Sequence, residues 1–180
     1  MNISPSGRDS RTYANWDADL TYRLNRLMSL RGVRPFFAMI SWLGNGKLWY
    51  TLILMLPLFA AANGLQAARH MALVGIINLL LYKLVKSFAQ RPRPFRACED
   101  ILAGTVALDE YSFPSGHTMH AVGFTVVAVA WFPPLAGVLL TFTILVALSR
   151  VILGLHYPTD VVLGAALGFG VARLSFLFAG

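Results

Sequence analysis

Three short clusters in this chain of 180 residues place groups that could bind phosphate or move protons beside apolar segments. The first runs from Lys86 to Pro94 and includes Arg91 and Arg93. Arginine presents a planar fork to phosphate oxygens and lysine a point charge, so the cluster is suited to an anionic group. Pro92 and Pro94 restrict the residues before them and hold both arginines in place. On its own, a basic membrane anchor explains this cluster equally well.

The second cluster is Pro114-Ser115-Gly116-His117, directly before the apolar run that begins at Thr118. A turn that opens a helix leaves backbone N–H groups free, which makes an anion site. Gly116 allows a ligand to approach the backbone closely. His117 could donate a proton to a leaving oxygen. Taken alone, the Ser-Gly pair is also explained as a helix cap.

The third cluster is Ser149-Arg150 followed by His156 and, four residues later, Asp160. The carboxylate can hold one ring nitrogen of the histidine, which leaves the other as a nucleophile or base. Pro158 suits the first turn of a helix and would place Asp160 within reach of His156. A structural His–Asp bond at the start of that helix is the alternative.

The composition indicates a membrane protein. The chain is 57% hydrophobic and 13% charged, with a mean hydropathy of +0.62, and so few charges cannot cover the surface of a soluble domain. Its 15 Lys and Arg against 8 Asp and Glu are not arranged as a nucleic-acid face, so anionic lipids and phosphate groups are the expected partners. Cys98 is the only cysteine, which excludes an internal disulfide and a thiolate metal cluster.

The apolar segments predict an all-α fold, a polytopic membrane bundle with about five spans, each near the roughly 20 residues that a bilayer requires. The predicted spans are 48–68, 71–85, the two halves of 118–149 on either side of Pro133-Pro134, and 161–180. The Pro- and Arg-rich segment 90–113 is the one long polar loop between spans, where function is often found.

Residues 1–47 are predicted to be a polar N-terminus followed by interfacial helices, and residues 48–180 the membrane domain. Apolar residues from Trp16 to Met28 recur at helical spacing, which suits either a helix in the membrane interface or a surface helix packed on the core. The run Phe36–Leu43 is too short to span and is interrupted by Gly44-Asn45-Gly46-Lys47.

Antiparallel spans bring the three clusters to one face of the membrane. That face then holds Lys86, Arg93, Arg150, His117, His156 and Asp160. In this spacing and order the chain resembles the type 2 phosphatidic acid phosphatase superfamily, which includes vanadium haloperoxidases and bacterial acid phosphatases. Its motifs are a Lys, six residues and Arg-Pro; Pro-Ser-Gly-His; and Ser-Arg, five residues, His, three residues and Asp. All three are complete here, and the resemblance covers about residue 48 to the C-terminus.

The resemblance implies a lipid phosphatase that needs no metal or cofactor. His156 would attack phosphorus, Asp160 would fix its tautomer and His117 would protonate the leaving group. The phosphate oxygens would be held by Lys86, Arg93, Ser115, Gly116 and Arg150. Arg91 and Arg96 are accessory candidates for a second phosphate or lipid head groups, whereas His70 and His120 are expected to be structural.

The favoured substrate is an undecaprenyl-type polyprenyl diphosphate, with phosphatidic acid or phosphatidylglycerophosphate as alternatives. Two other functions stay open: a vanadium-dependent haloperoxidase, and a catalytically silent lipid-binding membrane protein. The expected location is the bacterial inner membrane. Nine Lys and Arg on the active-site face (seven in residues 1–47, with Arg91 and Arg96) against Arg69 and Arg173 opposite favour a cytoplasmic site. Relatives that recycle lipid carriers commonly face outward.

Overall fold

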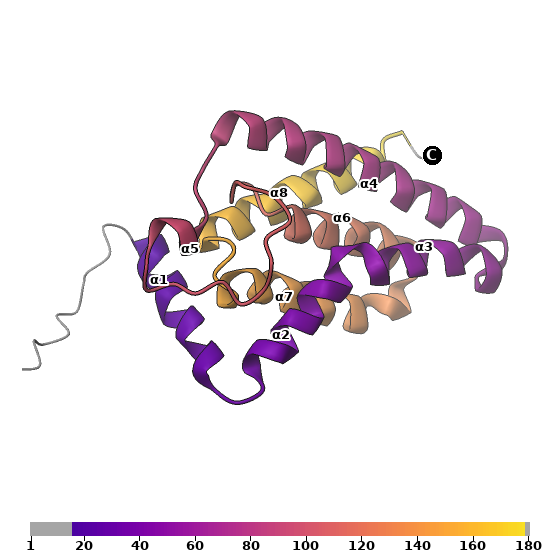
Figure 1. Cartoon of the computed structure of the whole chain (residues 1–180). Helices are drawn as coiled ribbons and strands as arrows, with labels where there is room; N and C mark the ends of the chain where they lie inside the picture. Colours follow the sequence, from indigo (N-terminus) through magenta and orange to yellow (C-terminus); the bar gives the residue numbers. More distant parts are fainter. Residues whose placement is uncertain (1–15, 179–180) are drawn as a thin grey trace, which may run out of the picture.

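The computed structural model describes residues 16–178, which form helices joined by loops with a single isolated β-bridge and no longer strand in that range (Figure 1). The helices are α1 (Trp16–Asn25), α2 (Val33–Trp42), α3 (Leu48–Phe59), α4 (Ala61–Ala89), α5 (Pro94–Ala97), α6 (Gly116–Trp131), α7 (Ala136–Ile152) and α8 (Pro158–Ser175). The shorter helical turns are η1 (Arg26–Ser29), η2 (Leu43–Lys47) and η3 (Pro133–Leu135). The all-α prediction is confirmed; the polar segment 1–15 lies outside the described residues.

The predicted span 48–68 is wrong in its C-terminal boundary. The chain turns at Ala60, so α3 ends at Phe59 and α4 continues from Ala61 through the whole predicted span 71–85. Pro57 lies in the last turn of α3, where its missing N–H weakens the helix. Arg69 and His70 do not end α4, because Arg69 is exposed and His70 is buried against polar partners.

The predicted hairpin at Pro133-Pro134 is confirmed, since α6 ends at Trp131, η3 begins at Pro133 and α7 follows. Helix α8 begins at Pro158, as predicted. It crosses α6 very closely, because a Cβ atom on Gly164 would lie 2.7 Å from the Ser115 carbonyl oxygen and one on Gly168 2.1 Å from that of Met119. Small residues four apart allow this approach, and it places the N-termini of α6 and α8 side by side.

Helices α2 and α3 form one rod that is kinked at η2 (Figure 1). Asn45 and Gly46 leave the helical conformation there, and Gly46 has a φ of +98° that favours glycine. The predicted break in the apolar run is therefore confirmed as a kink rather than a chain reversal. Ser41, just before the kink, is buried beside the end of α7.

Helix α1 has two different faces. Its buried residues are Asp17, Ala18, Thr21 and Asn25, which are mostly polar. Trp16 and Leu20 of its apolar stripe are exposed. The helix thus packs on the body of the protein through polar groups and leaves its apolar stripe free to meet a membrane interface.

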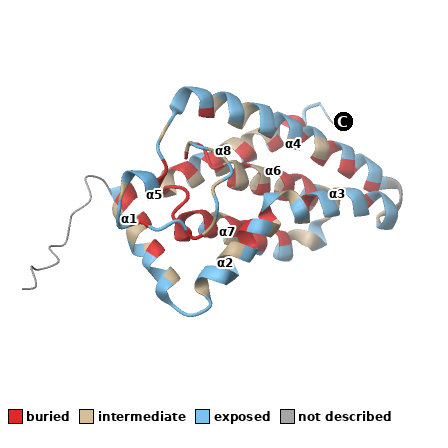
Figure 2. Cartoon of the chain, viewed as in Figure 1, coloured by how far each residue is buried: buried red, intermediate tan, exposed pale blue. Residues whose placement is uncertain are grey.

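The core lies between α3, α4, α6 and α7, where Trp49 contacts Phe124 and Phe142. The outer face of α4 is exposed and apolar, as at Leu80 and Leu84 (Figure 2). Two stretches are long and apolar enough to cross a bilayer, Asn63–Ala89 and Pro133–Ile152. No other helix of residues 16–178 is both long enough and apolar enough, so the count of five spans stays a prediction.

Candidate active site

A pocket of about 200 Å³ lies between the η2 kink, α4 and the first turns of α6. Its polar side is lined by Arg93, Asp109, Gly116, His117, His120, Arg150 and His156. Its apolar side is lined by Trp49, Tyr50, Leu79, Tyr82, Leu108 and Phe124. The pocket can therefore take a ligand with a charged end and an apolar neighbour.

Two buried cations line the polar side, Arg93 before α5 and Arg150 near the end of α7. A third, Lys86 at the end of α4, does not line the pocket but contacts its Asp109. Arg93 donates from Nη1 to the Leu155 carbonyl oxygen at 2.7 Å, which ties the loop before α5 to the loop before α8. Arg150 donates from Nη1 to the Ser41 hydroxyl, and its Nε is buried without a hydrogen-bond partner. An unpaired N–H beside a pocket is available to an anion.

Asp109 bridges two of these cations. Its Oδ1 lies 2.6 Å from Lys86 Nζ and 2.6 Å from Arg93 Nη2, and its backbone carbonyl accepts from Arg93 Nε at 3.0 Å. Burial alone would raise the pKa of Asp109, but Lys86 and Arg93 outweigh it and hold that pKa below its ordinary value. The carboxylate thus carries its charge at the position where two cations converge.

His156 is almost fully buried in the loop between α7 and α8, and it is in its neutral form. Its Nε2 lies 3.3 Å from Arg93 Nη1. A guanidinium can only donate, so Nε2 accepts and the ring proton belongs to Nδ1. Burial lowers the pKa of His156 well below 6.5, and Arg150, Arg93 and Lys86 add to that shift. Its Nε2 therefore carries a lone pair on the pocket side, as a nucleophile requires.

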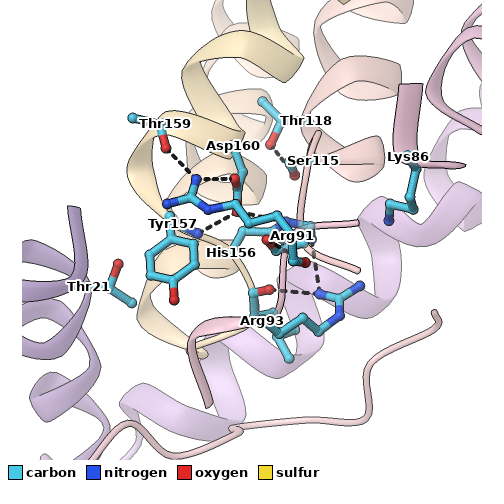
Figure 3. Close-up of polar contacts among 12 residues, drawn as sticks. Thr21, Lys86, Arg91, Arg93, Ser115, Thr118, His156, Tyr157, Thr159 and Asp160 are labelled. Carbon is cyan, nitrogen blue, oxygen red and sulfur yellow. Dashed lines mark hydrogen bonds and ion pairs between the residues drawn. The ribbon is translucent and has the colours of Figure 1, made fainter. Parts of the chain in front are cut away.

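Asp160, in the first turn of α8, stands behind His156 (Figure 3). Its Oδ2 accepts from the Tyr157 N–H at 2.8 Å and lies 3.7 Å from His156 Nδ1, just beyond hydrogen-bond distance. His156 Nδ1 makes no hydrogen bond among the described residues. A small ring rotation would close this gap, and apo structures often show catalytic hydrogen bonds lengthened in this way.

The predicted residues of α6 divide between the pocket and its support. Gly116 and His117 line the pocket. Ser115 is buried behind it, where its Oγ pairs with Thr118 Oγ1 at 2.9 Å and its N–H donates to the Asp160 carbonyl oxygen at 3.0 Å (Figure 3). In this structure Ser115 joins α6 to α8 rather than facing the pocket.

The two accessory candidates lie elsewhere. Arg91 contacts Asp17, Thr159 and Asp160, and does not line the pocket. Arg96 is exposed and pairs with Glu110 at 3.2 Å. Neither residue lines the pocket, and each pairs with a nearby carboxylate instead.

Three residues near the site were not predicted to belong to it. Asp109 is an acidic residue in a loop without any pattern. His120, expected to be structural, lines the pocket one turn after His117 and donates from Nδ1 to the Gly116 carbonyl oxygen at 2.8 Å. The helical spacing from His117 could have indicated its position. Asp17 belongs to α1, far from the motifs in sequence.

No metal-binding group forms among residues 16–178, since no three His, Cys, Asp or Glu side chains there come close enough to share an ion. The three cations, two histidines and one carboxylate of the three motifs are instead gathered around one pocket and its rear wall. This arrangement can hold an anion with arginines and lysine, and can present a neutral histidine to it.

Comparison with known proteins gives the same answer as the motifs. The chain is 26% identical over 152 residues to the undecaprenyl-diphosphatase of Sulfolobus acidocaldarius, covering 84% of this chain and 71% of that one. Its fold matches the crystal structure of Aquifex aeolicus LpxE with a TM-score of 0.80, at 24% identity, over 91% of this chain and 96% of that one. It also matches a PAP2 type phosphatidylglycerolphosphate phosphatase from Bacillus subtilis with a TM-score of 0.71, at 27% identity, over 92% and 87% of the two chains.

The family model of the PAP2 superfamily matches residues 64–180, which contain all three motifs and therefore confirm the resemblance predicted from them. The pocket, its neutral histidine and the cations around it all lie within or against this matched region. The chain belongs to the PAP2 superfamily.

Proposed function

We propose that this chain is an integral membrane phosphatase that removes phosphate from a lipid phosphate or diphosphate through a phosphohistidine on His156. One observation carries the proposal: Nε2 of His156 accepts from Arg93 at the edge of a pocket that Arg150 and His117 also line. A phosphate in that pocket would meet a nucleophile, cations and a proton donor together, which is how phosphoryl transfer is accelerated. The names of two relatives, an undecaprenyl-diphosphatase and a phosphatidylglycerolphosphate phosphatase, support the same class of reaction.

In the first step, His156 Nε2 attacks phosphorus. An N–P bond forms, the bond from phosphorus to the lipid oxygen breaks, and His117 gives its proton to the departing oxygen. Asp160 accepts the Nδ1 proton of His156 as a hydrogen bond and stabilises the charge that develops on the ring. In the second step, a water that gives its proton to His117 attacks phosphorus, the N–P bond breaks and phosphate leaves. Both steps use only side chains of this chain and a water molecule, so we propose a reaction that needs no metal.

Lys86, Arg93 and Arg150 would hold the phosphate oxygens, because transition-state charge spreads over those oxygens and fixed cations stabilise it. Arg150 Nε is already free for this, and the Gly116 backbone would add a donor. Lys86 and Arg93 would first have to exchange the Asp109 carboxylate for phosphate. Ser115 would join them only after leaving Thr118.

We favour an undecaprenyl-type polyprenyl diphosphate as the substrate, with phosphatidic acid and phosphatidylglycerophosphate as alternatives. The apolar side of the pocket, which includes Leu79 and Phe124, supports a lipid of some kind. The undecaprenyl-diphosphatase named above supports the diphosphate.

We further propose five membrane crossings, α3, α4, α6, α7 and α8, with residues 1–47 at the active-site face of the membrane. The order of these helices returns the chain to the active-site end after α4 and after α7, which supports placing α1 and the active site on one face (Figure 1). The positive charge of residues 1–47 favours the cytoplasm for that face in the bacterial inner membrane.

Cys98, a partly exposed thiol of the active-site loop, tests this orientation. Labelling in intact cells by a membrane-impermeant maleimide, absent from a Cys98→Ser control, would contradict a cytoplasmic site.

The function itself is tested by phosphate release from purified protein in detergent with undecaprenyl diphosphate, undecaprenyl phosphate, phosphatidic acid and phosphatidylglycerophosphate, each with and without EDTA. We expect release that EDTA does not abolish, highest with the diphosphate, and none from His156→Ala. Inactivity of the wild-type protein on all four lipids, or full turnover by His156→Ala, would contradict the proposal.

A further inference from the structure

Asp17 of α1 is a buried carboxylate that belongs to none of the three motifs. It is 4% exposed, and both of its oxygens are used. Oδ1 accepts from the Thr159 N–H at 3.0 Å, and Oδ2 accepts from Arg91 Nη2 at 2.7 Å and from the Thr159 hydroxyl. A helix near the N-terminus is thereby tied to the first turn of α8, 142 residues later in the chain.

Arg91 connects Asp17 to Asp160. Figure 3 shows the contacts of Arg91 with Thr159 and Asp160. While Nη2 contacts Asp17, Nη1 donates to Asp160 Oδ1 at 2.7 Å and to Thr159 Oγ1 at 2.7 Å. The guanidinium carbon lies 3.9 Å from the centre of the Tyr157 ring. Burial opposes the charge of Arg91, but Asp17 and Asp160 outweigh it and raise the pKa of Arg91. The guanidinium is therefore charged and held on three sides.

These contacts determine how Asp160 faces His156. Because Arg91 holds Oδ1, the other oxygen, Oδ2, is turned to the side where the Tyr157 N–H and His156 Nδ1 lie. Without a cation between them, Asp17 and Asp160 would be two buried carboxylates facing each other, which is strongly unfavourable. Asp17 in turn fixes the second arm of the Arg91 fork, so the fork cannot rotate away from Asp160.

We propose that Asp17 and Arg91 are positioning residues that act on the reaction through Asp160, so that α1 is part of the catalytic apparatus although it lies outside the matched family region 64–180. The inference rests on the proposed function. It assigns Arg91 a place behind the nucleophile rather than on a second phosphate of the substrate, since its donors point to Asp17, Thr159 and Asp160.

The test compares Asp17→Asn, Arg91→Lys and the double variant with the wild-type protein, measuring kcat and KM on a lipid monophosphate and a lipid diphosphate. Asparagine keeps the shape of Asp17 without its charge, and lysine keeps the charge of Arg91 but cannot contact both acids. We expect kcat to fall roughly tenfold to a hundredfold, as for other partners that orient a functional histidine, with KM within about twofold of the wild-type value. The double variant should be no worse than the poorer single variant, because the two residues act as one unit.

Asp19→Asn is the matched control: it lies on the same helix, but it forms an exposed ion pair with Arg23. Its kcat should equal that of the wild-type protein. Full kcat in Asp17→Asn would overturn the inference. So would an Arg91→Lys variant whose KM rises only for the diphosphate, because that result would place Arg91 on the substrate.

Melting temperatures of the same proteins separate this inference from the proposed function. If the wild-type protein hydrolyses no lipid phosphate, the proposed function fails, but the coupling between Asp17 and Arg91 can still be measured. Shifts in melting temperature smaller in the double variant than the sum of the single shifts would support the pairing. Additive shifts would overturn it whatever the activity.

Discussion

The bundle of α4, α6 and α8 has a polar cluster towards each of its two ends, and the clusters differ in whether a buried histidine makes all its hydrogen bonds. One cluster contains Lys86, His117, His156 and Asp160; the other contains His70, Trp131 and Ser175. The 14 residues from His117 to Trp131 separate the two ends by roughly 20 Å of helix. Both clusters bury histidine among helices that are otherwise apolar.

The His70 cluster is closed. Trp131 Nε1 donates to His70 Nδ1 at 3.1 Å, so the ring proton is on Nε2, which donates to the Ser175 hydroxyl at 2.7 Å. Ser175 then donates to the Ala172 carbonyl oxygen at 2.7 Å. Each polar group has a partner, and Ser175 cannot be activated by a ring nitrogen that itself carries the proton.

The His156 cluster is open. Nδ1 of His156 and Nε of Arg150 are buried without a hydrogen bond, and a pocket lies beside them. A buried histidine therefore indicates chemistry when some of its hydrogen-bonding capacity is unused. Here a lone pair faces a cavity, and an incoming ligand can replace the partners of the nearby cations. Exchanging the same side chain at both ends tests this contrast directly.

The largest effect is expected for His156→Gln. Without the nucleophile no phosphohistidine forms, so kcat should fall at least about a thousandfold, the scale of losing a covalent nucleophile. Phosphate release from a lipid phosphate measures it. Unchanged melting with lost turnover would support the open cluster as the reactive one; turnover within tenfold of wild type would contradict it.

His117→Ala should produce the next largest loss, and the loss should depend on the leaving group. A lipid alkoxide needs a proton, so kcat should fall by roughly 10²- to 10⁴-fold on a lipid phosphate. With p-nitrophenyl phosphate, whose leaving group is stable as an anion, the loss should be much smaller. Equal losses on both substrates would show that His117 is not the general acid.

Asp109→Asn is expected to have a smaller effect of the opposite sign. Asp109 pairs with Lys86 and Arg93, so removing its charge should free both cations for the substrate. The KM for the lipid and the inhibition constant of inorganic phosphate should both fall. The fall should be roughly twofold to fivefold, because Asp109 is partly exposed in both ion pairs. Glu110→Gln, the adjacent loop acid paired with Arg96, is the control and should change neither constant. A higher KM would instead mean that Asp109 orients the two cations.

Much of the open cluster was predictable because its residues belong to motifs of fixed spacing, and these motifs lie at or next to helix ends. Lys86, His117 and His156 follow or precede apolar segments, and antiparallel packing brings such ends together. The pairing of Trp131 and Ser175 with His70 was not predictable, because it depends on where three helices end relative to one another. The end of α3 was mispredicted because no charged residue interrupts the apolar segment 48–68, although Pro57 and Asn63-Gly64 lie on either side of the turn at Ala60.

Asp17 and Asp109 were missed because each acts through contacts distant in sequence. Asp17 reaches Arg91, 74 positions later, and Asp109 reaches Lys86, 23 positions earlier. Neither has a periodic or motif neighbour that would single it out from an ordinary solvated acid. Arg91 lies within a motif, yet its type alone suits a phosphate and a carboxylate equally well.

His70→Gln completes the contrast and should have the smallest effect on turnover. Glutamine cannot reproduce both ring contacts, so Trp131 Nε1 or the Ser175 hydroxyl loses its partner inside the bundle. Leaving one such buried group unpaired costs about 1–3 kcal/mol, which should lower the melting temperature while kcat stays within about twofold of wild type. The same substitution would then stop turnover at one end of the helices and only loosen the fold at the other. If His70→Gln instead reduced kcat as much as His156→Gln without changing the melting temperature, satisfied hydrogen bonds would no longer distinguish a structural histidine from a reactive one in this protein.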